Sequence, residues 1–184
     1  ECAINFDNPF IVLELLGLKN KKSLQRVVLL ALITRIHQAM YLTERATKKS
    51  CIIDEAWDLL GDETGNAAKF IETGYRTARR HNANFISISQ SIADYYKNST
   101  AMAAFMNADF TIVLGQKDQD IEQLEKNDRF PVDGFIKRVL KSLRMVDKEY
   151  SECLIQSPHG MTVHRIVFAP YLRVLFSSKG AEFE

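Results

Sequence analysis

Two consecutive carboxylates, Asp54 and Glu55, follow a short run of apolar residues within the stretch SCIIDEAWDLL at positions 50–60. A buried strand that ends in this way can bring its first carboxylate to the Mg²⁺ ion that bridges the terminal phosphates of a nucleotide. The glutamate that follows can orient or deprotonate the attacking water. The same pattern also fits a core strand whose Asp54 caps a following helix. On this stretch alone the two interpretations remain open.

Four apolar runs predict the strands that would position such a site, at residues 10–15, 51–54, 85–89 and 110–114. Stretches with helical spacing lie between and after them, at residues 23–43, 56–60, 66–82, 92–96 and 101–106. Because strands and helices alternate, the pattern predicts an α/β fold with a mainly parallel sheet and flanking helices. The first two strands and the helix between them predict a βαβ unit.

The helix predicted at residues 23–43 is apolar nearly all round in its middle. We therefore expect the sheet to cover one side of it and other protein to cover the opposite side.

The last third of the chain has a different pattern. Residues 118–126 and 132–143 predict helices, and residues 152–156 and 161–168 predict an antiparallel hairpin across the turn SPHG. Such strands often edge a parallel sheet. The tail beyond Pro170 fits either a strand or a short helix.

Polar residues stand at the carboxyl ends of three of the predicted strands. They are Asp54 with Glu55, Ser89 with Gln90, and Gln116. Ligands of open parallel sheets collect at the carboxyl ends of the strands. This convergence favours a Walker B strand. Asp54 would then hold Mg²⁺ through a water, Glu55 would act as the catalytic base, and Gln90 would sense the γ-phosphate. For Gln116 an ordinary polar role is favoured.

Three arginines, Arg76, Arg79 and Arg80, are expected on one outward face of the second long helix. One of them could be an arginine finger for the nucleotide of a neighbouring subunit. The group could instead contact a nucleic-acid backbone, or be a solvated basic helix end that favours the helix C-terminus. Spacing does not choose among these interpretations.

Composition limits the remaining function classes. The chain has 184 residues, 46% of them hydrophobic, which is enough to bury one core. Its net charge of +1 gives no overall electrostatic field that would attract nucleic acid. The three cysteines are far apart, which suits a reducing compartment, and we expect a cytosolic protein. The longest purely apolar run is too short to span a bilayer. His159 and His164 lack zinc-ligand spacing to other residues.

One expected motif is missing from the sequence. Nowhere is there a Gly-x-x-x-x-Gly-Lys-Ser/Thr loop that would cradle the phosphates. The chain also opens at Glu1 without an initiator Met. We therefore expect a piece of a longer protein, with the phosphate loop (Walker A) before Glu1.

Three ordered motifs identify a family. Residues 54–60 (DEAWDLL), 74–80 (GYRTARR) and 88–94 (ISQSIAD) together resemble the C-terminal ATPase domain of the TraC/VirB-type motors of type IV secretion and conjugation. Residues 10–18 also resemble the strand that precedes the long helix there. The resemblance is strong over residues 10–116 and looser beyond.

The resemblance implies a RecA-like P-loop fold of the HerA/FtsK-like group, with residues 1–184 as the C-terminal part of the ATPase domain. By motif match it implies Walker B roles for Asp54 and Glu55, a sensor role for Gln90, and a finger role for Arg79 or Arg80. It further implies binding of ATP and Mg²⁺ and a homo-oligomer, such as a hexamer. That oligomer would be cytoplasmic and peripheral to the inner membrane through other secretion components. Direct contact with nucleic acid stays open.

The sequence departs from the family pattern at two places. The basic pair is commonly Arg-Lys and is Arg79-Arg80 here, which keeps the charge. The residue before the glutamine is commonly Thr and is Ser89 here, which keeps the hydroxyl.

The sequence supports one main hypothesis and two alternatives. The main hypothesis is an ATP-hydrolysing motor subunit for pilus assembly or substrate transfer, inactive as this piece alone. The alternatives are a DNA-translocating coupling ATPase and a non-catalytic docking domain with the same fold.

Overall fold

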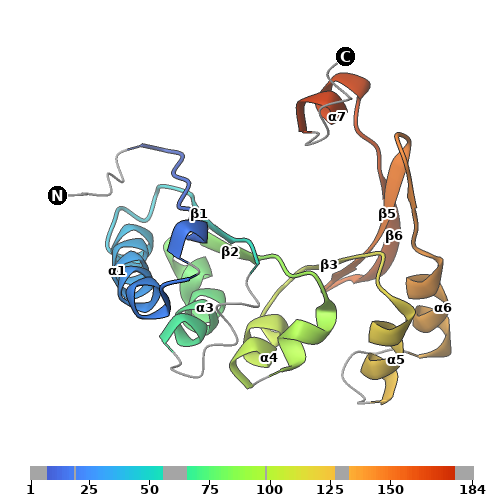
Figure 1. The fold of residues 1–184 in the computed structure, drawn as a ribbon, viewed down its shortest axis with the longest axis horizontal. Coiled ribbons are helices and arrows are strands. Elements are labelled where there is room, and N and C mark those ends of the chain that lie inside the picture. The colour runs from blue at the N-terminus through green and yellow to red at the C-terminus, as the bar shows by residue number, and fades with distance from the viewer. Residues whose placement is uncertain (1–7, 19, 56–65, 98, 127–132, 177–184) are drawn as a thin grey trace. The chain divides into compact units, whose positions relative to one another are not determined.

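The structure is a computed structural model that describes residues 8–18, 20–55, 66–97, 99–126 and 133–176. The chain divides into two compact units (Figure 1). The first comprises Glu1–Ser89 and Lys97–Asn107, and the second comprises Gln90–Tyr96 and Ala108–Glu184. The helical turn predicted at residues 56–60 lies outside the described residues.

The first unit is a parallel strand pair with helices. Its elements are η1 (Leu16–Leu18), α1 (Lys22–Tyr41), β1 (Lys49–Ile53), α3 (Asn66–Thr77), η2 (Ala78–His81), β2 (Ala83–Ser87) and α4 (Ser99–Met106). β1 and β2 run parallel, with Lys49 opposite Ala83 and Ile53 opposite Ser87. Since α3 connects the two strands, the parallel crossover unit is β1–α3–β2.

The strand predicted at residues 10–15 is wrong. The described chain there is irregular and leads into the single turn η1. Phe10 and Val12 are 77% and 74% exposed, although a strand covered on both faces would bury them. A strand needs a partner for its backbone groups, and none of the described residues pairs with this segment. The βαβ unit predicted from this strand is therefore wrong as well.

The long helix predicted at residues 23–43 is confirmed as α1. It buries Leu32 and Met40, and α1 packs against α3 and η2. Its other side exposes Val27 and Leu30. These two residues lie on the side of the helix that we expect other protein to bury.

Helix α3 packs very closely on β2 at Gly74. A Cβ atom built on Gly74 would meet the ring of Phe85 at 2.5–2.7 Å. The same ring makes an edge contact with Phe70, with ring centroids 5.5 Å apart. The absence of a side chain at position 74 therefore lets the helix lie directly on the strand.

Gly74→Ala is expected to destabilise the protein by about 1–3 kcal/mol, because the added methyl group forces the Phe85 ring or the helix to move. Denaturant unfolding would measure this loss. Gly134→Ala is a matched control, since Gly134 is also helical and nothing lies within 4 Å of its added Cβ. The control should leave stability unchanged or raise it by up to about 1 kcal/mol. Equal effects of both changes would contradict the close-packing explanation.

The second unit combines an antiparallel sheet with helices. Its elements are η3 (Ile92–Tyr96), β3 (Thr111–Leu114), α5 (Asp118–Lys126), α6 (Gly134–Ser142), β4 (Met145–Val146), β5 (Tyr150–Ser157), β6 (Gly160–Ile166) and α7 (Pro170–Phe176). The predicted hairpin is confirmed as β5 and β6. The tail after residue 170 begins as the helix α7.

The prediction that residues 110–114 extend the parallel sheet is wrong. β3 pairs antiparallel with β5, with Val113 opposite Leu154. Both of these side chains are buried, at 4% and 2% exposure. An apolar run of this length fits either kind of sheet, and the hairpin supplies the partner.

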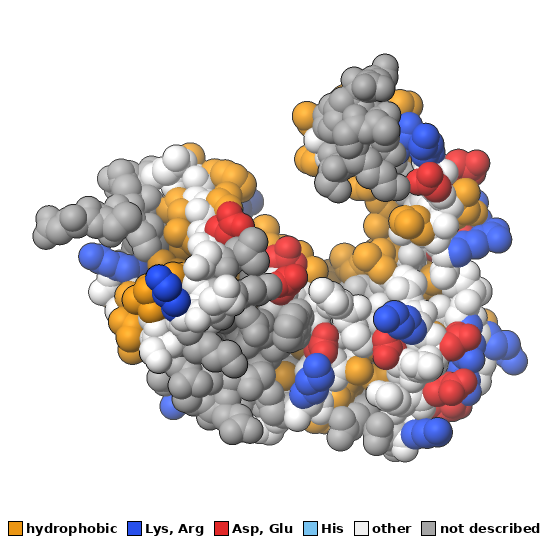
Figure 2. All heavy atoms as spheres, viewed as in Figure 1, with side chains coloured by type: hydrophobic (Ala, Val, Ile, Leu, Met, Phe, Trp, Pro, Cys, Tyr) orange, Lys and Arg blue, Asp and Glu red, His pale blue; other side chains and the backbone are white. Residues whose placement is uncertain are grey.

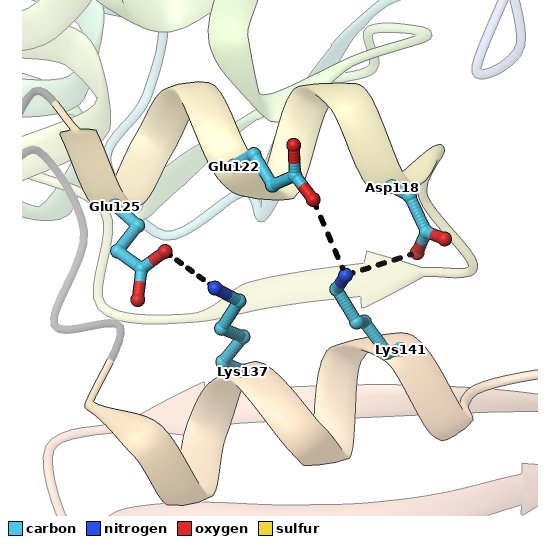
Figure 3. Close-up of polar contacts among 5 residues, drawn as sticks. All are labelled: Asp118, Glu122, Glu125, Lys137 and Lys141. Carbon is cyan, nitrogen blue, oxygen red and sulfur yellow. Dashed lines mark hydrogen bonds and ion pairs between the residues drawn. The ribbon is translucent and has the colours of Figure 1, made fainter.

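Helices α5 and α6 face each other with complementary charges (Figure 3). Lys137 pairs with Glu125, and Lys141 lies 3.7 Å from Asp118 and 3.6 Å from Glu122. The hydrogen bond to Glu125 raises the pKa of Lys137. Such exposed pairs contribute little each, so the buried apolar sides of the two helices supply most of the stability.

The hairpin carries one paired carboxylate. Arg165 Nε donates to Glu152 Oε1 at 3.0 Å, and its guanidinium lies over the ring of Tyr150. The hydrogen bond from Arg165 lowers the pKa of Glu152 below its usual 4.5. The Glu152–Arg165 pair therefore stabilises the folded protein above about pH 4.5, and this stabilisation is lost as the pH falls through the lowered pKa of Glu152.

Many large apolar side chains reach the surface (Figure 2). In the first unit, one face of the β1–β2 pair exposes Ile52, Ile86 and Ile88, while Phe85 faces the helices and is buried. The parallel pair is thus covered by described residues on one face only.

No described helix is long and apolar enough to cross a bilayer.

Candidate functional site

Asp54 and Glu55 leave the carboxyl end of β1, as predicted. Ile53, the last residue of the strand, accepts a backbone hydrogen bond from Ile88 N–H at 2.9 Å. Both carboxylate residues are exposed. The strand β1, which is half-buried on one face, therefore ends in two exposed acidic side chains.

The backbone at this edge is unusual. Glu55 has φ of +51°, a left-handed conformation that costs a residue other than glycine about 1–2 kcal/mol. The N–H of Glu55 donates to Asp54 Oδ1 at 2.9 Å, which closes a tight turn around the first carboxylate. Such strained residues cluster at active sites.

Asp54 suits a magnesium ion better than a softer metal. Mg²⁺ prefers oxygen ligands and keeps several waters, so one carboxylate that acts through a water is a suitable protein contribution. The described residues contain no group of three or more His, Cys, Asp or Glu side chains arranged to hold a metal by themselves.

Gln116 has a structural role in the second unit. Its Oε1 accepts a hydrogen bond from Ile92 N–H at 3.3 Å, and its Nε2 donates to the carbonyls of Leu114 and Gly115. These bonds tie the end of β3 to the start of η3. They agree with the ordinary polar role favoured for Gln116.

Gln90 is exposed and also belongs to the second unit, directly before Ser91. There the Ser91 N–H donates to Asp94 Oδ2, and the Asp94 N–H donates to the carbonyl of Ser91. These two bonds shape the start of η3. Asp54 and Glu55 belong to the first unit, so their convergence with Gln90 stays a prediction. The argument from a shared parallel sheet fails for Gln116, because β3 belongs to the antiparallel sheet.

The three arginines lie on two consecutive elements. Arg76 lies in the last turn of α3 and pairs with Glu72 at 3.0 Å, whereas Arg79 and Arg80 belong to the following turn η2. All three are exposed. Asn82, with φ of +53°, then ends this turn, as predicted for the helix end.

Arg79 and Arg80 lie at the amino end of the parallel pair. Turn η2 leads into Ala83, which stands opposite Lys49. β1 is five residues long, so Asp54 lies about 16 Å farther along the strand. That distance exceeds the length of an arginine side chain. Neither arginine can therefore reach the Asp54 edge of its own chain, and a finger role requires a second subunit.

The amino end gathers further cations that the sequence did not single out. Asn82 Nδ2 donates to the carbonyl of Ala46, and Lys49 N–H donates to the carbonyl of Asn82. These bonds bring the loop with Arg45 and Lys48 beside η2. Sequence spacing could not find this, because the two segments lie more than thirty residues apart.

Comparison with known proteins gives three findings. The sequence profile of the TraG P-loop domain matches residues 4–167. Protein TraC of Escherichia coli (strain K12) is 36% identical over 191 residues, which cover all of this chain and 22% of that protein. The structure is similar to VirB4 of Thermoanaerobacter pseudethanolicus, with a TM-score of 0.67 and 22% identity over 91% of this chain and 44% of the other.

These matches bear on the fold. The structural similarity to VirB4 confirms the predicted α/β fold, with its parallel strands, flanking helices and antiparallel hairpin. The chain spans less than half the length of each of these two relatives.

Proposed function

The chain belongs to the TraG P-loop domain family, and on that premise we propose that it carries the Walker B half of a nucleotide site. The full-length protein would be an ATP-hydrolysing motor subunit of a type IV secretion or conjugative pilus assembly system. The observation that carries this proposal is the exposed Asp54–Glu55 pair, at the end of a parallel strand, in a chain with this family match.

Each site residue has a proposed task. Asp54 orients a water that is bound to the nucleotide's Mg²⁺, and this ion would supply charge stabilisation for the transferred phosphoryl group. Glu55 orients or deprotonates the attacking water. Gln90 contacts the γ-phosphate. Arg79 or Arg80 acts on the nucleotide of a neighbouring subunit, because both lie at the far end of the parallel pair from Asp54.

The proposal extends to the assembly. We expect residues 1–184 to be the C-terminal part of a RecA-like ATPase domain whose Walker A loop lies earlier in the full-length protein. The motor would be a homo-oligomer, such as a hexamer. It would act in the cytoplasm, held at the inner membrane by other secretion components. Without the phosphate loop, this chain alone should bind ATP weakly and hydrolyse almost none.

The test is Mg²⁺-dependent ATP hydrolysis by the purified full-length protein, with and without double-stranded DNA. We expect hydrolysis that DNA changes by less than about twofold, because residues 1–184, with a net charge of +1, supply no broad field for a polyanion beside the site. Strong stimulation by DNA would instead support a DNA-translocating coupling ATPase. No hydrolysis in an assembled oligomer would support a docking domain without catalysis.

A further inference from the structure

The hydroxyl of Tyr75 on α3 makes two hydrogen bonds to one residue at the end of β2. It accepts a hydrogen bond from the backbone N–H of Ser87 at 3.0 Å. It also shares a hydrogen bond with Ser87 Oγ at 2.7 Å. Both contacts are part-buried, where hydrogen bonds are stronger than in water. A single side chain from the helix therefore holds the last residue of β2.

Ser87 lies beside the end of β1. It stands opposite Ile53 in the register, and the next residue, Ile88, donates its N–H to Ile53 O at 2.9 Å. Asp54 follows Ile53 directly. A shift of Ser87 would therefore shift the backbone from which Asp54 and Glu55 project.

The helix that carries Tyr75 is itself fixed against the same strand. Gly74, the preceding residue, lies on the ring of Phe85, and the Tyr75 ring has its centroid 6.2 Å from the Phe85 ring. The helix therefore offers a rigid base for the tyrosine hydroxyl.

The opposite face of the strand pair provides little support within the described residues. Ile52 and Ile86, which come directly before the paired residues Ile53 and Ser87, are 62% and 42% exposed. Ile88 is exposed as well. The ends of β1 and β2 are thus supported from the α3 side, where the Tyr75 hydroxyl bonds both the backbone and the side chain of Ser87.

We propose that Tyr75 is a positioning residue for the candidate site. Its hydroxyl holds Ser87, and through the bond from Ile88 to Ile53 it holds Asp54 and Glu55 where Mg²⁺ binding and water attack need them. The catalytic part of this inference rests on the proposed function. The mechanical part, that the hydroxyl immobilises the strand end, does not.

The catalytic test uses Tyr75→Phe in the full-length protein. Because small misplacements of catalytic groups are costly, we expect kcat to fall about tenfold, the Mg²⁺ concentration for half-maximal activity to rise about threefold or more, and KM for ATP to stay within about twofold. Tyr41→Phe is the matched control, since Tyr41 is a part-buried tyrosine of the same unit that packs against His37 and His81. It should leave all three values unchanged.

A double-variant comparison separates positioning from general stability. Ser87→Ala removes only the bond to Ser87 Oγ and leaves the bond from the Ser87 N–H, so it should reproduce part of the effect of Tyr75→Phe. Adding Ser87→Ala to Tyr75→Phe should cost no more than Tyr75→Phe alone. Additive losses would overturn the proposal. A loss of kcat that only follows the folded fraction, with an unchanged Mg²⁺ requirement, would overturn it too.

Hydrogen exchange tests the mechanical part without any catalysis. In the full-length protein without nucleotide, Tyr75→Phe should speed amide exchange at Ser87 and Ile88 about tenfold or more, and Tyr41→Phe should not. Unchanged exchange would overturn the inference whatever the ATPase result. If exchange speeds up while Glu55→Gln leaves hydrolysis intact, the proposed function fails and the positioning of the strand end stands.

Discussion

Glu55→Gln in the full-length protein is expected to lower ATP turnover by about 10²–10⁴-fold while nucleotide affinity stays within about twofold. The glutamine amide keeps the size of the side chain and the backbone bond from residue 55 to Asp54 Oδ1. It removes the carboxylate that would accept a proton from the attacking water. Steady-state hydrolysis and equilibrium binding of a labelled nucleotide measure the two quantities.

Two further variants guard this result. Glu44→Gln removes an exposed carboxylate of the same unit, away from the end of β1, and should leave turnover unchanged. Glu55→Gly removes the carboxylate but relieves the positive φ of 51°, so it should lose turnover without a loss of stability. Undiminished hydrolysis by Glu55→Gln would sink the assignment of this residue as the base.

Replacing both Arg79 and Arg80 with Ala is expected to lower turnover of the assembled protein by about 10³-fold or more, as loss of an arginine finger does. Both residues belong to the turn η2 at the amino end of the parallel pair, and the length of β1 places Asp54 about 16 Å from that end. They can therefore act only on the site of another subunit. The variant should still bind nucleotide, because its own Asp54 and Glu55 are intact.

Mixed oligomers test this action between subunits. When the arginine variant is combined with Glu55→Gln, some interfaces join an intact carboxylate pair to intact arginines, and part of the activity should return. Arg35→Ala, a change to an exposed arginine on α1, is the control and should retain full turnover. If mixing restores nothing, a finger that acts in trans is excluded.

Local signals predicted most helices well. The polar segment at residues 118–126 forms α5 with these bounds, and the long apolar pattern at residues 23–43 forms α1. The end of the second long helix at Asn82 was also predictable, because asparagine adopts the left-handed conformation more readily than most residues. Each of these signals is contained within the segment itself.

Strand pairing could not be predicted in the same way. Residues 10–15 and 110–114 have similar apolar runs, yet the first is irregular and the second forms β3 against β5. What separates them is the partner, which lies elsewhere in the chain and leaves no mark on the run. The two-residue strand β4 (Met145–Val146) was missed because so short a segment has no periodicity.

The site residues show the same difference between local signals and long-range contacts. The Asp54–Glu55 pair was predictable, because an apolar run and the acids that end it are adjacent in sequence. The bond between Tyr75 and Ser87 was not, since it joins a helix to a strand twelve residues farther along the chain. The distance between the arginines and Asp54 also required the parallel register. A motif therefore predicted the chemical groups, whereas the strand register was needed to see which of them lie at the same end of the parallel pair.

The most direct measurement is a structure of the full-length oligomer with Mg²⁺ and a non-hydrolysable ATP analogue. The account predicts Mg²⁺ within about 4–5 Å of the Asp54 carboxylate, joined to it by a water, and the Glu55 carboxylate within hydrogen-bond reach of a water at the γ-phosphate. Arg79 or Arg80 of a neighbouring subunit should approach the same phosphate. A nucleotide bound away from the end of β1, with Asp54 and Glu55 facing solvent, would contradict the account.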